Sequence, residues 1–126
     1  MSIELMLVAV GGAAGAVTRY ATAVLAVRLW GETFPWGTLI VNLAGCFMIG
    51  LVYAAGVEAG ALGPRARLFV MTGLLGGLTT FSSFGLETST LLMQGTSLYA
   101  TLNILGNVVG GLLMFMLAVV LGRILL

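Results

Sequence analysis

The sequence predicts an all-α membrane protein with four transmembrane helices in each subunit. Of its 126 residues, 60% are hydrophobic and only 7% are charged, and the mean hydropathy is +1.18. A soluble domain carries about 25% charged residues, so these few charges could not cover a surface that faces water. The charges are also absent from long stretches, and about 20 mostly apolar residues suffice for a helix to cross a bilayer.

The positions of the charged residues locate the four spans. No charge lies between Glu32 and Glu58, between Arg67 and Glu87, or between Glu87 and Arg123. The alternation that is typical of barrel strands is absent. We therefore expect a single four-helix transmembrane domain over residues 1–126, with spans at roughly 4–28, 35–57, 66–93 and 98–122.

Short connections separate the spans. The segments Gly31–Pro35 and Gly60–Pro64 and the pair Gln94-Gly95 mark the turns. Proline is favoured at the first position of a helix. Pro35 and Pro64 are therefore expected to begin the second and third helices.

The composition excludes several classes of function. The chain has no His, so it has no triad base and no His metal site. The single Cys46 cannot form an internal disulfide or a thiolate metal cluster. A net charge of +1 leaves no basic surface for binding nucleic acid. A signal peptide is also not expected, because the first residues lack its positively charged region. We expect a multi-pass protein of a cell (inner) membrane that is not an enzyme and binds no nucleic acid.

The arginines give a small topological bias. With four spans, Arg65, Arg67 and Arg123 share one side of the membrane and Arg28 lies on the other. This bias favours termini in the cytoplasm, and it is small enough that both orientations could insert.

Glycine spacing bears on the number of subunits. Small residues four positions apart let membrane helices approach closely, and packing within one subunit would explain any single pair. Their number over three spans predicts a homo-oligomer, most simply a dimer. The pairs are Gly11/Gly15, Gly73/Gly77 and Gly106/Gly110.

Two charged residues lie within the expected spans. Arg19 is well inside the first span, where a charge is costly unless it is paired or hydrated. It either extends to the interface or gives a fixed positive charge that concentrates anions in a vestibule. Glu87 lies late in the third span and is either the partner of Arg19 or a structural residue near the membrane edge.

Uncharged polar residues lie on two helix faces. Thr38, Asn42 and Cys46 are four residues apart and share a face of the second span, and Asn103 and Asn107 repeat that spacing in the fourth. Amides in membrane helices often only hold helices together. Three of them at helical spacing favour a polar pathway that replaces the hydration of an ion.

The third span contains an unusual run between Gly73 and Phe84. Adjacent glycines, Gly76 and Gly77, weaken a helix interior by about 1 kcal/mol each, and hydroxyl-bearing residues follow them: Thr79, Thr80, Ser82 and Ser83. This run predicts a break in the third helix at mid-membrane, with a purely structural kink as the alternative. Freed carbonyls there could hold a cation, and freed N–H groups favour an anion.

Two phenylalanines lie within the hydroxyl-rich run. Phe81 and Phe84 are three residues apart and share a helix face. Such a pair in a membrane helix is usually packing, but the edge of an aromatic ring is positive. An anion could approach two ring edges at a shallow site.

Three segments resemble the Fluc-type fluoride channels (the CrcB family): Gly76–Phe84, Gly37–Asn42 and Gly15–Tyr20. The resemblance covers essentially the whole chain in length, number of spans and order of motifs. It implies an antiparallel dual-topology homodimer in the lipid bilayer, with two fluoride pores along the subunit interface. It also implies a structural sodium ion at the dimer centre, held by backbone carbonyls.

The resemblance assigns roles to individual residues. The sodium carbonyls would be those of Gly76 and Thr79. The pore and anion-binding residues would be Phe81, Phe84, Asn42, Thr38, Ser82, Ser83, Arg19 and Glu87. The chain departs from the family pattern at Ser83, where threonine is common, and at Gly111, where the family has serine. Asn107, one turn before Gly111, could supply the missing donor.

The resemblance implies passive export of fluoride that relieves its toxicity. Hydrogen fluoride would enter as the neutral acid and ionise inside, and the membrane potential would drive the anion out at about 2.3 kcal/mol per 100 mV. A proton-coupled small multidrug exporter would need a carboxylate deep in the first span, which has Glu4 only at its edge. A non-transporting assembly subunit would explain the glycines but not the polar faces together with the break.

Overall fold

The computed structural model describes residues 2–126, and its ordered elements are all helical. Four of its helices are long and apolar enough to cross a membrane: Ile3–Trp30, Trp36–Glu58, Pro64–Met93 and Ser97–Leu125. The four membrane-length helices predicted from the charge pattern are therefore confirmed.

Only the first span is one regular α-helix, α1 (Ile3–Trp30). The other three contain π-helical segments, which the apolar pattern gave no reason to expect. The second span consists of α2 (Trp36–Val52) and η1 (Tyr53–Glu58). The third consists of α3 (Pro64–Arg67), η2 (Leu68–Leu75), α4 (Gly76–Leu78) and α5 (Phe81–Met93). The fourth consists of α6 (Ser97–Ile104), η3 (Leu105–Gly110) and α7 (Gly111–Leu125).

The turns follow the expected residue chemistry with one correction. Gly31, Gly60 and Gly95 have φ values of 77°, 68° and 78°, a conformation that is strained for residues with a side chain. Pro64 is the first residue of its helix, as predicted. Pro35 is not: its ψ of 66° makes it the residue before α2, which begins at Trp36.

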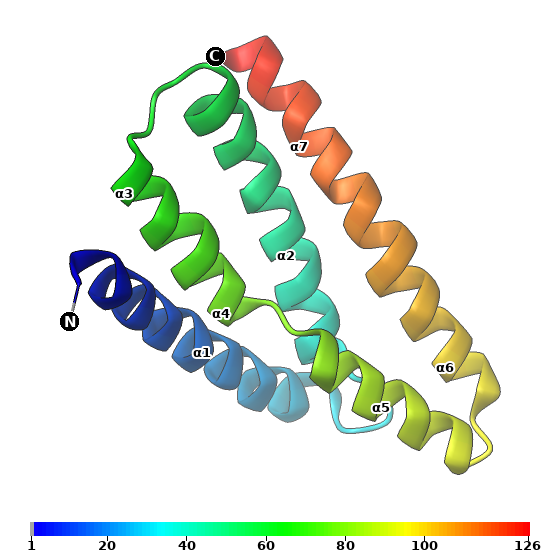
Figure 1. Cartoon of the computed structure of the whole chain (residues 1–126). Helices are drawn as coiled ribbons and strands as arrows, with labels where there is room; N and C mark the ends of the chain where they lie inside the picture. The colour runs from blue at the N-terminus through cyan, green and yellow to red at the C-terminus, as the bar shows by residue number, and fades with distance from the viewer. Residues whose placement is uncertain (1) are drawn as a thin grey trace.

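Each of the four spans packs along a neighbour, and the third span has different neighbours along its length (Figure 1). α1 lies along η2 and α4, α2 lies along α7, and α5 contacts α6. The central buried cluster is small and consists of Val41, Leu75 and Leu78, with Ile49 and Val70 packed against it. Many other large apolar side chains are exposed, as expected where lipid rather than water is the surrounding solvent.

Direct backbone contact joins α1 to the third span. A Cβ atom at Gly15 would overlap the carbonyl oxygen of Leu74 and lie 2.7 Å from the amide nitrogen of Leu78. A Cβ atom at Gly77 would lie 2.5 Å from the carbonyl oxygen of Gly12. These glycines therefore let the two helices approach to a distance that no side chain would permit.

The glycine pairs make contacts within one chain, so they do not provide the evidence for an oligomer that was inferred from their spacing. Gly73 packs on Gly11 of the same chain, with its Cβ position 3.1 Å from the Cα of Gly11. Gly106 faces Leu39 of the second span, with its Cβ position 3.0 Å from the nearest methyl carbon. The glycines are thus used within one chain, and the dimer stays a prediction that needs other support.

Two ion pairs mark one end of the molecule. Arg65 pairs with Glu4 at 3.7 Å, and Arg123 makes two bonds to Glu58 at 2.8 and 2.6 Å. The start of α1, the loop at 59–63 and the C-terminus therefore lie at this end, and the loops at 31–35 and 94–96 lie at the other (Figure 1). The expected placement of Arg65 and Arg123 on one side is confirmed.

Candidate functional site

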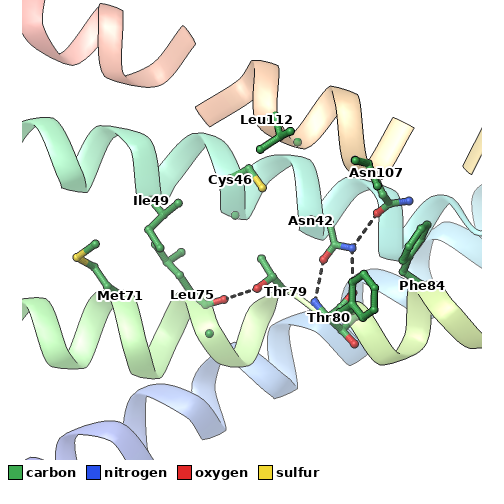
Figure 2. A pocket seen from close by; sticks show the side chains of 15 residues that line it. Asn42, Cys46, Ile49, Met71, Leu75, Thr79, Thr80, Phe84, Asn107 and Leu112 are labelled. Carbon is green, nitrogen blue, oxygen red and sulfur yellow. Dashed lines mark hydrogen bonds between the residues drawn. The ribbon is translucent and has the colours of Figure 1, made fainter. Parts of the chain in front are cut away.

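A cavity of about 460 Å³ lies between the second, third and fourth spans (Figure 2). Its walls are mainly apolar, with a group of polar side chains at one end. The polar and aromatic lining residues are Asn42, Cys46, Thr79, Thr80, Phe81, Phe84 and Asn107. The residues on which the sequence analysis focused are thus largely brought to one place by three different helices.

The third span changes conformation beside this cavity. Thr79 (φ −83°, ψ 155°) and Thr80 (φ −151°, ψ 127°) have extended backbone and separate α4 from α5. Gly76 keeps helical angles (φ −64°, ψ −36°). The extended residues therefore lie after the glycine pair that sequence reasoning had singled out.

The side chain of Asn42 pairs with the backbone of Thr80 in the way that a neighbouring strand would. The Thr80 amide donates to Oδ1 of Asn42 at 2.8 Å, and Nδ2 of Asn42 donates to the Thr80 carbonyl oxygen at 3.0 Å (Figure 2). An unpaired backbone group away from water costs several kcal/mol. Asn42 therefore satisfies both polar groups of an extended residue in the membrane.

The hydroxyl of Thr80 caps the helix that follows. Its Oγ1 accepts a hydrogen bond from the amide of Ser83 at 3.1 Å, which is the usual role of a threonine at this position. The hydroxyl of Ser82 lies 3.3 Å from the same oxygen. Sequence reasoning placed Thr80 in the motif but not among the site residues, although a threonine before Phe81-Ser82-Ser83 fits the capping pattern.

These contacts leave two carbonyls without their helical donors. In a continuous helix the amides of Thr80 and Ser83 would donate to the carbonyls of Gly76 and Thr79, four residues earlier. They donate instead to Asn42 and to the Thr80 hydroxyl. The two freed carbonyls are those that the family resemblance assigns to sodium.

A row of amides supports Asn42 from the fourth span. Nδ2 of Asn42 also donates to Oδ1 of Asn107 at 2.8 Å, and Nδ2 of Asn107 donates to the carbonyl and side-chain oxygens of Asn103 at 2.9 Å each. Asn103 is fully buried and donates to Thr88 at 2.9 Å. The hydrogens of Asn42 and Asn107 are therefore committed to other protein groups, and Asn107 has no spare donor to replace a hydroxyl at Gly111.

The two phenylalanines are brought together as their spacing predicts. The ring centroids of Phe81 and Phe84 are 5.5 Å apart, with 56° between the ring planes. Phe84 is buried, whereas Phe81 is 80% exposed in the single chain. One wall of the cavity therefore opens onto the outer face of the subunit.

Thr38 and Glu87 lie at a second, smaller cavity of about 200 Å³ near the loop at 31–35. Thr38 donates from Oγ1 to Oε1 of Glu87 at 2.7 Å. Oε2 of Glu87 is buried and has no hydrogen-bond partner among residues 2–126. The polar residues of the predicted track thus divide between two cavities.

Arg19 contacts the third span but not Glu87. Its Nε donates to the carbonyl oxygen of Gly77 at 3.2 Å, and the described part of the chain contains no ion pair between Arg19 and Glu87. Nor does that part contain a cluster of His, Cys, Asp or Glu that could hold a metal ion.

The fold and the site define a multi-pass membrane protein whose polar side chains meet where the third span is extended. The chain belongs to the CrcB-like family, because the model of that family (CrcB-like protein, camphor resistance) matches residues 6–119. The resemblance seen in the sequence is thereby confirmed.

Several similar proteins carry the name fluoride-specific ion channel FluC. The one from Opitutus terrae is 49% identical over 119 residues, which cover 93% of this chain and 87% of the relative. The one from Shewanella amazonensis is 48% identical over 106 residues, or 84% and 85% of the two chains. The one from Dehalococcoides mccartyi is 43% identical over 122 residues, or 97% and 94%.

Proposed function

We propose that the protein is a fluoride-selective channel through which fluoride leaves the cell passively across the cytoplasmic membrane, relieving fluoride toxicity. The observation that carries the proposal is the aromatic pair Phe81–Phe84 beside the extended residues Thr79 and Thr80, in a family whose relatives are named fluoride channels. Ring edges and hydroxyls can attract a small anion without a full counter-charge, so the anion would be bound loosely enough to leave.

The route would run along the outer face of each subunit. Phe81 is exposed there, and an ion pathway cannot remain open to lipid. A second copy that covers this face would close the route, which supports a homodimer. Antiparallel insertion of the two copies would generate two equivalent pores, and the small bias in arginine placement permits both orientations.

The polar residues have distinct roles in this proposal. Arg19 would attract the anion by its charge, the hydroxyls of Ser82 and Ser83 would replace water near the rings, and Thr38 with Glu87 would line the far end. Because the amide hydrogens of Asn42 and Asn107 are already donated, an anion would contact either amide only if one of these bonds opened.

The carbonyls of Gly76 and Thr79 fit a sodium site. Hard cations take oxygen ligands, and the amides that would occupy these oxygens in a helix donate elsewhere. A symmetric partner would add the same two oxygens. A bound sodium ion would supply a fixed positive charge between the subunits, where it would fix the extended segment and favour an anion nearby.

Ion efflux from liposomes tests the function. Vesicles that contain the purified protein are loaded with fluoride or chloride, valinomycin carries potassium as the counter-ion, and an electrode reads the anion outside. We expect rapid loss of fluoride with retention of chloride. Retention of both anions by a folded dimer would refute the channel and favour an assembly subunit.

A proton-coupled exporter has less support. It needs a carboxylate deep in the first span, and the acidic residue of α1 is Glu4 in its first turn. Glu4 is paired with Arg65. The relatives are also named as ion channels, which agrees with passive movement.

A further inference from the structure

We propose that Asn42 and Thr80 are positioning residues for the sodium site, because together they remove the amide donors that would otherwise occupy the carbonyls of Gly76 and Thr79. The inference rests on the sodium site of the proposed function and assigns to these two side chains the task of keeping its ligands free.

Asn42 acts on the carbonyl of Gly76. The Thr80 amide is the helical donor to that oxygen, and it is held by Oδ1 of Asn42 at 2.8 Å. The orientation of the Asn42 side chain is fixed, because the backbone N–H can bond only to its oxygen and Nδ2 meets two oxygens, of Thr80 and Asn107. Without Asn42, the Thr80 amide would be free to donate to the Gly76 oxygen, as it would in a continuous helix.

Thr80 acts on the carbonyl of Thr79. The Ser83 amide is the helical donor to that oxygen, and it is held by Oγ1 of Thr80 at 3.1 Å. The same bond caps α5, so the start of the helix and the exposure of the Thr79 carbonyl depend on one hydroxyl. A valine at position 80 would keep the shape and lose the acceptor.

Side chains also occupy carbonyls that are not needed for the cation. Arg19 donates to the oxygen of Gly77 at 3.2 Å, and Asn42 donates to the oxygen of Thr80 at 3.0 Å. Side-chain donors therefore bind the carbonyl oxygens of Gly77 and Thr80. Side-chain acceptors bind the amides of Thr80 and Ser83, so these amides do not occupy the carbonyl oxygens of Gly76 and Thr79. This pattern separates ligand oxygens from structural ones within five residues of backbone.

The test measures sodium binding without measuring flux. Thermal unfolding of the purified protein in detergent is followed as sodium replaces potassium at constant ionic strength, since a ligand that binds the native state raises stability as its concentration rises. We expect Thr80→Val to need about five to ten times more sodium for half of the stabilisation, the factor that corresponds to one hydrogen bond. Thr80→Ser keeps the acceptor and should need about as much sodium as the wild type.

Two control variants distinguish the loss of the acceptor for the Ser83 amide from a general loss of helix stability. Thr90→Val removes a hydroxyl of the same helix that bonds only to Leu86, and it should leave the sodium requirement unchanged. Ser83→Pro in the Thr80→Val background removes the amide itself in the first turn, where proline is tolerated, and should restore sodium binding. Asn42→Leu is the equivalent change for the Gly76 oxygen and should also raise the sodium requirement.

The outcomes distinguish this inference from the proposed function. An unchanged sodium requirement in folded Thr80→Val and Asn42→Leu, with sodium stabilising the wild type, overturns the positioning roles and leaves the channel and its cation intact. Failure of Ser83→Pro to restore binding in a folded double variant also overturns them. A wild type that conducts fluoride but gains no stability from sodium removes the cation site and this inference with it.

Discussion

Arg19 donates from Nε to the carbonyl oxygen of Gly77 at 3.2 Å and makes no ion pair with Glu87. The bond holds the guanidinium of the half-buried Arg19 against α4, which precedes the extended residues Thr79 and Thr80. Its other N–H groups have no protein acceptor within residues 2–126, so they can face an incoming anion. The charge is thus held in place without being neutralised.

Replacement of Arg19 should weaken fluoride flux in a way that depends on salt. Arg19→Gln keeps a hydrogen-bond donor but loses the charge, and we expect flux to fall by about tenfold at low ionic strength, within the range of electrostatic attraction. Arg19→Lys should retain more of the flux. Efflux at about 0.01 M and about 0.1 M salt, where the screening length changes from about 30 to about 10 Å, measures the effect. Equal salt dependence in the wild type and Arg19→Gln would contradict it.

Loss of either ring of the aromatic pair should lower flux and leave the assembly intact. Phe81→Leu and Phe84→Leu keep apolar bulk but remove the positive ring edge that would face the anion, so we expect fluoride efflux to slow by up to about tenfold, which corresponds to about 1.4 kcal/mol. Phe115→Leu is the control, since Phe115 contacts Tyr53 instead. Size-exclusion chromatography measures whether each variant keeps its oligomeric state. If every variant that loses flux also dissociates, the two rings serve in packing instead of in the pore.

Substitution of Gly15 should destabilise the fold far more than the same change one turn earlier. The Cβ of Gly15→Ala would collide with backbone atoms of Leu74 and Leu78, whereas that of Gly12→Ala would meet the oxygen of Gly73 at an ordinary 3.9 Å. Overpacking against backbone costs about 1–3 kcal/mol. Denaturation in detergent should therefore separate the two variants, and equal stabilities would refute the described contact between α1 and α4.

Removal of the buried amide at position 103 should weaken the link between α5 and α6. Asn103→Leu removes the donor to the Thr88 hydroxyl and one of the two acceptors of the Asn107 amide, and a buried polar group left unsatisfied costs about 1–3 kcal/mol. Thr101→Val, on the same helix, removes only a bond from an exposed hydroxyl to Ser97. Unfolding free energies should rank wild type and Thr101→Val above Asn103→Leu.

The sequence predicted the spans well because their signal is local. Charges that are spaced far apart and prolines at helix starts act through neighbouring residues, so the four helices and the position of Pro64 followed directly. The proximity of Phe81 to Phe84 followed from helical spacing for the same reason. Pro35 was predicted to be the first residue of the second helix, whereas it immediately precedes α2, which begins one residue later than predicted.

The site could be predicted only in part, because its key contacts join distant segments. Asn42 was recognised as a polar residue in a membrane helix, but its pairing with Thr80 spans 38 positions and depends on an extended backbone whose position the glycines did not reveal. The glycine pairs could not establish the oligomeric state for a related reason. Spacing shows that a helix can be approached closely, but it does not show whether the approaching helix belongs to the same chain.

Four hydrogen bonds of the amide row form a chain that runs in one direction: from the amide of Thr80 to Asn42, from Asn42 to Asn107, from Asn107 to Asn103, and from Asn103 to Thr88. Such a chain is polarised cooperatively, yet no side chain in it gains or loses a proton near neutral pH. These four bonds therefore form a polarised chain at the centre of the protein that offers no ionisable group to relay a proton.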